Sequence, residues 1–327
     1  MNIVVTIGPA SWGPEVVSGL LECGVHRFRF PMSKELPEVH LENIRRLRGI
    51  AASCGREVEV IADLPGGKPR LSNTEPIELQ EREYAITAAS QAEGKLFLDP
   101  SLDLDALRPG ARITIGDGEN TFVVSSNQAH TLTGHFVRGG VLERRRAFLP
   151  TGLGSGIGCL TENDERLVRV ARLARAETLA FSFIASGEDV ERVRGCVPIA
   201  DGWAPRIVAK IETLDGVTRA REIAQSADEV MIARGDLALQ VGFERLYSCQ
   251  KAIATACRLE GTPFIVATGV CEGFGAGRDL SRAEAIDVGV ARDMGADSVM
   301  LSGETTIGPR PIEVVQALAT LIRGGQA

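Results

Sequence analysis

The sequence predicts a (β/α)8 TIM barrel with a small β domain inserted after the third strand. Three observations lead to this fold class. Short apolar runs alternate with amphipathic stretches along most of the 327 residues, as parallel strands and their covering helices do. The alternation stops after Asp63 and resumes near Leu149. Polar residues also follow nearly every apolar run, at the strand end where barrels of this type carry their functional groups.

The repeating part of the chain supplies the barrel strands and their helices. Ser11, Thr161 and Ser281 are candidate N-caps, and Pro14 suits a first helical turn. Glu284 completes a capping box with Ser281. The expected strands are Asn2–Thr6, Gly24–Phe30, Val58–Ala62, Thr178–Phe183, Arg206–Ile211, Glu229–Ala233, Pro263–Ala267 and Ser298–Leu301. The expected helices are Pro14–Cys23, Glu38–Cys54, Glu162–Arg175, Gly187–Arg194, Leu214–Gln225, Phe243–Leu259, Ser281–Met294 and Pro311–Ile322.

The middle of the chain lacks this alternation and indicates a separate β module. Leu64–Arg70 is rich in turn-forming residues, and short β-type runs separated by turns follow it. We therefore expect a catalytic barrel from 1–69 and 149–327, and an inserted β lid domain from 70–148. The expected lid strands are Ile86–Ala89, Arg112–Ile115, Thr121–Ser125 and His130–Val137, with a turn at Asp117–Gly118.

Composition excludes several classes of partner. The net charge of −7 argues against nucleic acid as a main partner. We expect the basic run Arg144–Arg146 to be a solvated or hinge segment, with a phosphate contact as the alternative. Seven scattered cysteines without a C-x-x-C motif argue against a disulfide framework or a zinc site. No signal segment or membrane-length apolar run is present, which predicts a cytoplasmic protein without a membrane partner.

One strand end concentrates charged residues of both signs. Lys210 and Glu212 are two residues apart, so their side chains share one face of a strand, and Asp236 follows one α/β unit later. A lysine beside two carboxylates favours a divalent cation with an anionic substrate, and a strand-end salt bridge is the alternative. We favour the cation because most strands end in polar residues. These are Thr6, Arg29, Asp63, Ser182, Lys210 with Glu212, Asp236, Thr268 and Ser302.

The second strand points an arginine toward the barrel interior. Its alternation places Arg27 and Arg29 on one face, opposite Phe28 and Phe30. An inward arginine requires an anion, so Arg29 is a candidate ligand for phosphate or carboxylate. The alternative is an ion pair with an inward carboxylate such as Asp63.

An ordered set of short motifs runs along nearly the whole chain. The main ones are TIGPAS at Thr6–Ser11, KIE at Lys210–Glu212, ARGDL at Ala233–Leu237, SRAE at Ser281–Glu284 and LSGET at Leu301–Thr305. Together with SFI at Ser182–Ile184 and the Arg29-x-x-x-Ser33 spacing, this set resembles the pyruvate kinase family. That family's architecture is a catalytic barrel with a β lid after the third strand.

The resemblance implies roles for the strand-end residues. Lys210 would neutralise the phosphoryl group during transfer, and Glu212 and Asp236 would hold Mg2+ or Mn2+. Thr268 would lie beside the reacting carbon of the enolate. Arg29 would act with Lys210 and Thr268 in catalysis, and Arg29 and Arg70 would contact phosphate. The implied substrate-binding residues are Arg29, Arg70, Ala233, Arg234, Gly235, Asp236 and Thr268, with the backbone N–H groups of the Ala233–Asp236 turn receiving a carboxylate.

Several positions depart from the family pattern. Pro31 replaces an asparagine and removes a ligand of the family's monovalent-cation site, while Lys68 replaces an acidic residue there. We therefore expect the Lys68 ammonium to substitute for the monovalent cation, so that K+ is not required. Lys34 replaces a histidine near the nucleotide phosphates, and Gly-Val-Cys follows Thr268 in place of Gln-Met-Leu, which leaves the acceptor open. The family's C-terminal regulatory domain is not expected.

The residues leave more than one activity open. The favoured function is Mg-dependent phosphoryl transfer between phosphoenolpyruvate or pyruvate and ADP or another acceptor. The alternative is a metal-dependent lyase or aldolase acting on a 2-oxo acid enolate, and a third hypothesis is a non-catalytic binding protein. The expected partners are a small-molecule substrate and a nucleotide, and the sequence leaves homo-oligomer formation open.

Overall fold

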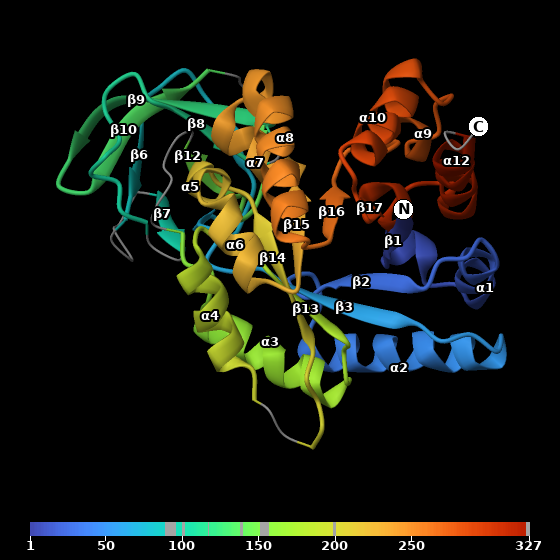
Figure 1. Cartoon of the computed structure of the whole chain (residues 1–327). Helices are drawn as coiled ribbons and strands as arrows, with labels where there is room; N and C mark the ends of the chain where they lie inside the picture. Colours follow the sequence, from blue (N-terminus) through green and yellow to red (C-terminus); the bar gives the residue numbers. More distant parts are fainter. Residues whose placement is uncertain are drawn as a thin grey trace.

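The predicted barrel is confirmed. A computed structural model describes residues 1–88, 96–99, 102–116, 118–137, 140–150, 157–198 and 201–324 of the chain (Figure 1). Eight parallel strands close in the order β1-β17-β16-β15-β14-β13-β3-β2. They are β1 (Asn2–Thr6), β2 (Arg27–Pro31), β3 (Glu59–Leu64), β13 (Thr178–Phe181), β14 (Arg206–Ile211), β15 (Glu229–Ala233), β16 (Phe264–Ala267) and β17 (Ser298–Leu301).

Four of these strands begin and end at the expected residues, and β2 shows why others do not. Gly24 has a φ of 87° and its N–H bonds to the Leu21 carbonyl, so the chain is still turning where a strand was expected. Alternate inward side chains then fill the barrel with an apolar layer, as in other barrels of this type. That layer contains Val4, Ile61, Ala180, Val208, Met231, Ala233, Ile265, Ala267 and Met300.

Helices surround the barrel and bury a second apolar layer against the outer faces of the strands. The longer ones are α1 (Pro14–Glu22), α2 (Pro37–Ser53), α3 (Glu162–Leu173), α4 (Gly187–Cys196), α8 (Phe243–Glu260), α10 (Arg282–Asp293) and α12 (Pro311–Gly324). The shorter ones are η1 (Pro9–Ser11), α5 (Leu214–Thr218), α6 (Ala220–Ser226), α7 (Arg234–Val241), α9 (Glu272–Gly275) and α11 (Gly303–Thr306).

Two of the three expected N-caps are confirmed. Thr161 and Ser281 each accept the backbone N–H of the third helical residue, in both cases at 3.2 Å and within a capping box. The Ser11 cap was wrong, because Ser11 belongs to η1 and Gly13 is the residue before α1.

The single helix expected at Leu214–Gln225 is divided into α5 and α6. The break lies at Arg219, whose φ of −104° and ψ of 19° leave helical geometry. The Thr218 hydroxyl donates to the Leu214 carbonyl, and such bonding from a β-branched residue weakens a helix.

The inserted segment forms its own sheets around its own apolar core. A seven-stranded sheet runs β12-β8-β9-β10-β6-β7-β4, and β11 pairs with β5 in the described residues. The expected strand at Arg112–Ile115 is confirmed at both ends. The last residue of the expected strand Ile86–Ala89 and the first of the expected turn Asp117–Gly118 lie outside the described residues. The lid strands are β4 (Arg70–Leu71), β5 (Ile77–Leu79), β6 (Tyr84–Thr87), β7 (Leu96–Asp99), β8 (Arg112–Ile115), β9 (Asn120–Gln128), β10 (Thr131–Phe136), β11 (Gly140–Leu142) and β12 (Phe148–Pro150).

The lid lies beside the ends of the barrel strands that carry the polar residues. Its last strand, β12, packs against α7, and Leu149 of that strand joins an apolar cluster with Phe183 and Leu239 (Figure 1). The Gly67 N–H donates to the Gly158 carbonyl at 2.7 Å, which ties the two connections between lid and barrel together. These contacts hold the lid over one side of the strand ends.

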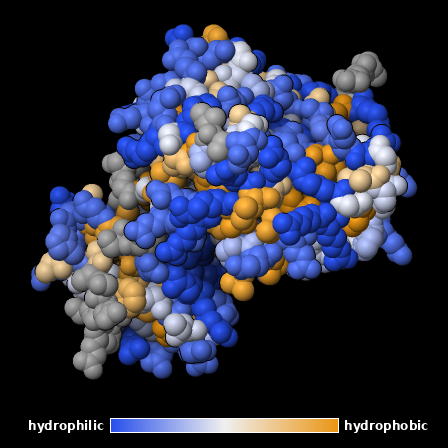
Figure 2. All heavy atoms as spheres, turned by 90° about the horizontal axis from the view of Figure 1, so that it is seen from below, coloured by the Kyte–Doolittle hydropathy of each residue, from blue (hydrophilic) through white to orange (hydrophobic). Residues whose placement is uncertain are grey.

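The face of the molecule seen from below is mainly hydrophilic (Figure 2). Figure 2 shows, from below, hydrophilic residues over most of that face and apolar residues gathered near its centre. Among the described residues, no helix combines the length and the apolar character that crossing a bilayer would require.

Candidate active site at the strand ends

Lys210 lies at the centre of the strand-end cluster. It is on β14, and its Nζ donates to Ser182 Oγ at 2.6 Å and to Asp63 Oδ1 at 3.0 Å. Glu212 Oε1 lies 3.4 Å from the same ammonium. The side chains of Lys210, Asp63 and Glu212 are all at least nine-tenths buried. The cluster therefore combines Lys210 and Glu212, which the sequence placed on one strand face, with polar groups at the ends of β3 and β13.

The buried charges hold one another in their ionised forms. Burial alone would lower the pKa of Lys210, but the carboxylates of Asp63 and Glu212 outweigh burial and raise it. Burial would likewise raise the pKa of Asp63, but Arg29 and Lys210 outweigh burial and lower it. The ammonium is therefore a permanent positive charge in a region that water reaches poorly, where its electrostatic effect is large.

Glu212 is buried near other carboxylates, and the positive charge of Lys210 does not fully balance them. The pKa of Glu212 is raised to about 6, chiefly by burial and against the opposing effect of Lys210. The negative charges of Asp236 and Asp63 contribute to this rise in pKa, while the Phe183 N–H, which donates to Glu212 Oε2 at 2.8 Å, works against it. A cation placed between Glu212 and Asp236 would relieve this excess of negative charge.

Asp236 lies in the first turn of a helix, α7, where the sequence indicated only the turn at Ala233–Asp236. Residues from Arg234 onward form α7, because helix-forming residues follow Gly235. Lys68 Nζ donates to Asp236 Oδ1 at 2.6 Å, with both side chains largely buried. The structure thus brings the predicted Lys68 to one carboxylate of the candidate metal site.

The donor set fits a hard divalent cation. The described residues contain no group of three or more histidine, cysteine or acidic side chains placed for a metal ion. Mg2+ does not require such a group, since it commonly binds through one or two carboxylates with water and substrate oxygens. Glu212 and Asp236 supply two carboxylates, and the raised pKa of Glu212 marks their unbalanced charge.

The two predicted phosphate-contacting arginines differ in their surroundings. Arg29 Nε pairs with Asp63 Oδ2 at 2.5 Å, and Arg29 Nη1 donates to Thr6 Oγ1 at 3.2 Å. The ion pair considered as the alternative for Arg29 is therefore present, within the same cluster as Lys210. Arg70 lies on β4 of the lid, where its Nη1 donates to the Arg145 carbonyl at 3.2 Å. Phosphate binding by either arginine stays a prediction.

Thr268 stands directly beyond β16 in an unusual backbone conformation. Its φ is 74°, in the left-handed region that β-branched residues rarely adopt. Its carbonyl accepts a hydrogen bond from Arg234 Nε at 2.9 Å. Thr268 also packs closely on Gly235, since a Cβ on that glycine would lie 3.2 Å from the threonine methyl group. Thr268 and the start of α7 therefore form one continuous surface.

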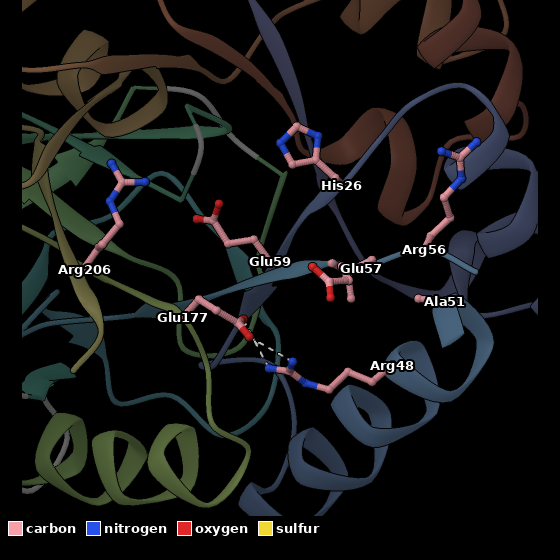
Figure 3. Close-up of a pocket in the computed structure, with 9 residues that line it drawn as sticks. His26, Arg48, Ala51, Arg56, Glu57, Glu59, Glu177 and Arg206 are labelled. Atoms are coloured by element: carbon pink, nitrogen blue, oxygen red, sulfur yellow. Dashed lines mark hydrogen bonds and ion pairs between the residues drawn. The ribbon is translucent and has the colours of Figure 1, made fainter. Parts of the chain in front are cut away.

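A cavity lies at the opposite end of the barrel. It measures about 640 Å³ and opens where β2, β3, β13 and β14 begin (Figure 3). Its charges are mostly compensated within the protein, as Arg48 pairs with Glu177 at 2.9 Å and Glu59 with the buried Arg27 at 3.0 Å. The pocket is lined by His26, Arg48, Ala51, Arg56, Glu57, Val58, Glu59, Glu177 and Arg206. The barrel rule and the uncompensated charge both place the candidate active site at the strand-end cluster instead.

Some residues of the site were not predicted as functional. Asp63 was predicted as a polar strand end and as an alternative partner of Arg29, and Ser182 as a polar strand end and part of a family match, but the contact of each with Lys210 was not predicted. Asp287 gave no signal in the sequence, because it is on a covering helix and reaches the site through Arg234. Glu304 is buried beside the same arginine, and burial raises its pKa. The available signal was the family match, since SRAE lies just before Asp287 and LSGET contains Glu304.

Comparison with known proteins supports the same region of the chain. The model of the pyruvate kinase barrel domain matches residues 1–315. The pyruvate kinase of Geobacillus stearothermophilus is 33% identical over 97% of this chain and 55% of its own length. The pyruvate kinase of Encephalitozoon cuniculi is 30% identical over 98% of this chain and 74% of its own length.

A third relative, the pyruvate kinase of Chlamydia pneumoniae, is 31% identical over 98% of this chain and 67% of its own length. The chain therefore spans from about half to three-quarters of the curated relatives that it matches. The barrel, the lid after its third strand and the matched family model together lead to one conclusion. The chain belongs to the pyruvate kinase family.

Proposed function

We propose that the protein is a metal-dependent phosphotransferase of the pyruvate kinase type, acting on phosphoenolpyruvate and pyruvate. Family membership supports this activity, and the three relatives compared above are named pyruvate kinases. The observation that carries the proposal is the buried Lys210 ammonium, held by Asp63, Ser182 and Glu212 at the strand ends. Phosphoryl transfer depends on positioning and charge compensation, which such a fixed cation supplies.

Each residue of the cluster has a distinct role in the proposed reaction. Glu212 and Asp236 hold Mg2+ or Mn2+, which when bound supplies Lewis-acid stabilisation of the substrate oxygens. Lys210 neutralises the phosphoryl group in transfer. The first N–H groups of α7, at Ala233–Asp236, receive the substrate carboxylate, since a helix N-terminus favours an anion. Thr268 lies at the carbon that gains or loses a proton.

The phosphate side of the substrate is assigned to the two arginines and the lid. Arg29 and Arg70 contact phosphate, with residues 1–69 and 149–327 as the catalytic barrel and 70–148 as the lid. ADP or another nucleotide is the acceptor. We also propose that the protein works in the cytoplasm on small molecules.

Lys68 replaces a monovalent cation in this proposal. Its ammonium lies 2.6 Å from Asp236 and brings a fixed positive charge to the metal-binding carboxylates. K+ is then not required. Activity should change little between K+-free and K+-rich buffers, and strong activation by K+ would contradict this assignment.

Phosphorus NMR distinguishes the proposed function from the alternatives. Phosphoenolpyruvate and Mg2+ are incubated with and without ADP. In a parallel D2O sample that contains pyruvate and Mg2+, proton NMR follows the C3 protons of pyruvate. ATP formation supports phosphoryl transfer. Exchange of the C3 protons without ATP formation supports a lyase or aldolase acting on the enolate. Absence of both, with phosphoenolpyruvate still bound, rules out either enzyme and leaves a binding protein.

A further inference from the structure

Thr268 requires an external restraint to keep its conformation. Two successive residues, Thr268 and Gly269, have φ values of 74° and 73°, and Cys271 follows at 58°. Glycine adopts this region freely, but a β-branched threonine does so only when its surroundings hold it. The hydroxyl and methyl groups of Thr268 are therefore directed by whatever fixes its backbone.

The restraint is a pair of charged side chains from two other elements. Arg234, the first residue of α7, donates from Nε to the Thr268 carbonyl at 2.9 Å. The two terminal nitrogens of Arg234 donate to Asp287 of α10 at 2.6 and 2.8 Å. A bidentate pair of this kind fixes the plane of the guanidinium group as well as its position. The orientation of Arg234 Nε, and hence of Thr268, depends on Asp287.

The same arginine has other acidic groups within reach of its charge. Glu304 is buried beside it, and Arg234 opposes the burial that raises the pKa of Glu304. If Asp287 lost its charge, Arg234 could turn toward Glu304 without leaving an unpaired buried cation. Such a turn would break the bond from Arg234 Nε to the Thr268 carbonyl. Asp287 is thus needed for the direction of Arg234 more than for its charge balance.

We propose that Asp287 is a positioning residue, which fixes Arg234 so that Arg234 holds Thr268 in its left-handed conformation against the reacting carbon. Asp287 itself touches neither substrate nor metal. This inference rests on the proposed function, because it assigns Asp287 to the step at C3 that Thr268 serves. It predicts a defect in proton transfer at C3 with substrate binding retained.

Asp287→Asn tests the inference, because asparagine keeps the shape of the side chain but removes its charge and leaves only one oxygen to accept from Arg234. We expect kcat to fall about tenfold and the KM for phosphoenolpyruvate to stay within about twofold, since small misplacements of catalytic groups cost rate. Exchange of the pyruvate C3 protons in D2O should fall by a similar factor. Asp287→Glu, which restores a bidentate carboxylate, should recover part of both rates.

Asp201→Asn is the matched control. Asp201 pairs with Arg172 at 2.6 Å on the surface, so this variant also removes one carboxylate from an arginine. It should leave kcat and C3 exchange unchanged. Circular dichroism and thermal unfolding show that each variant is folded.

The outcomes separate the inference from the proposed function. If the wild-type protein transfers no phosphoryl group and exchanges no C3 protons, the proposed function fails. If the wild-type protein is active and Asp287→Asn lowers only the melting temperature, Asp287 has a structural role and the inference fails. An increase in KM with unchanged kcat would also overturn it, because that result would assign Asp287 to substrate binding.

Discussion

Replacing Lys210 by methionine tests the electrostatic reasoning about the strand-end cluster. The substitution keeps most of the side-chain volume and removes the ammonium from its contacts with Ser182, Asp63 and Glu212, at 2.6, 3.0 and 3.4 Å. Removing one charge from a buried ion pair typically costs about 3–5 kcal/mol. The lower end of this range is expected here, because each carboxylate keeps another partner.

Those remaining partners set the size of the stability effect. Asp63 keeps its ion pair with Arg29 at 2.5 Å, and Glu212 keeps the Phe183 N–H at 2.8 Å. Glu212, whose pKa is already raised to about 6, can also take up a proton at little cost. We therefore expect Lys210→Met to fold, with a free energy of unfolding about 3 kcal/mol lower than that of the wild type.

The catalytic effect should be larger than the structural one. Removal of a single preorganised group that stabilises the transition state costs about 10²–10³ in kcat. A coupled assay of phosphoenolpyruvate consumption with ADP measures this loss, and Lys251→Met, at an exposed position on α8, is the control. Folded Lys210→Met protein with turnover within tenfold of the wild type would refute the role given to this lysine.

Three further predictions concern neighbouring features. Lys68→Gln should make activity depend on K+, since the fixed charge beside Asp236 is lost, and K+-independent activity in this variant would contradict the substitution. Gly235→Ala should lower kcat several-fold with little loss of stability, because the new methyl group would press on Thr268 from 3.2 Å; unchanged kinetics would show that Thr268 tolerates displacement. Burial lowers the pKa of His40 below 6.5, so the unfolded chain takes up a proton at a higher pH than the folded chain does. The free energy of unfolding should therefore fall as pH drops below about 6.5. Urea unfolding at a series of pH values should show a weaker dependence of this free energy on pH for His40→Gln.

The sequence was sufficient for the parts of the site that depend on local periodicity. The two-residue spacing of Lys210 and Glu212 predicted that their side chains share one strand face. In the structure the Glu212 carboxylate lies 3.4 Å from the Lys210 ammonium. The barrel was predictable for the same reason, since eight apolar runs with helices between them allow few other arrangements.

Contacts between distant segments were beyond sequence reasoning. The Lys68–Asp236 pair joins residues 168 positions apart and depends on how the chain leaves β3. α7 was missed because Gly235 near its start indicated a turn. The residues after Gly235 favour a helix, and contact with β12, a strand distant in sequence, adds packing that the sequence did not show. Several lid strands have only two or three residues, too few to show an alternation.

Phosphorus NMR on the wild-type protein and Lys210→Met in the same buffer tests whether the strand-end cluster transfers a phosphoryl group. Each sample contains phosphoenolpyruvate, Mg2+ and ADP, with other nucleoside diphosphates in parallel samples. For the wild type we predict loss of the phosphoenolpyruvate signal with matching growth of nucleoside triphosphate signals, and for Lys210→Met neither change. Wild-type protein that releases inorganic phosphate without any triphosphate, or leaves phosphoenolpyruvate intact with every acceptor, would contradict the proposed function.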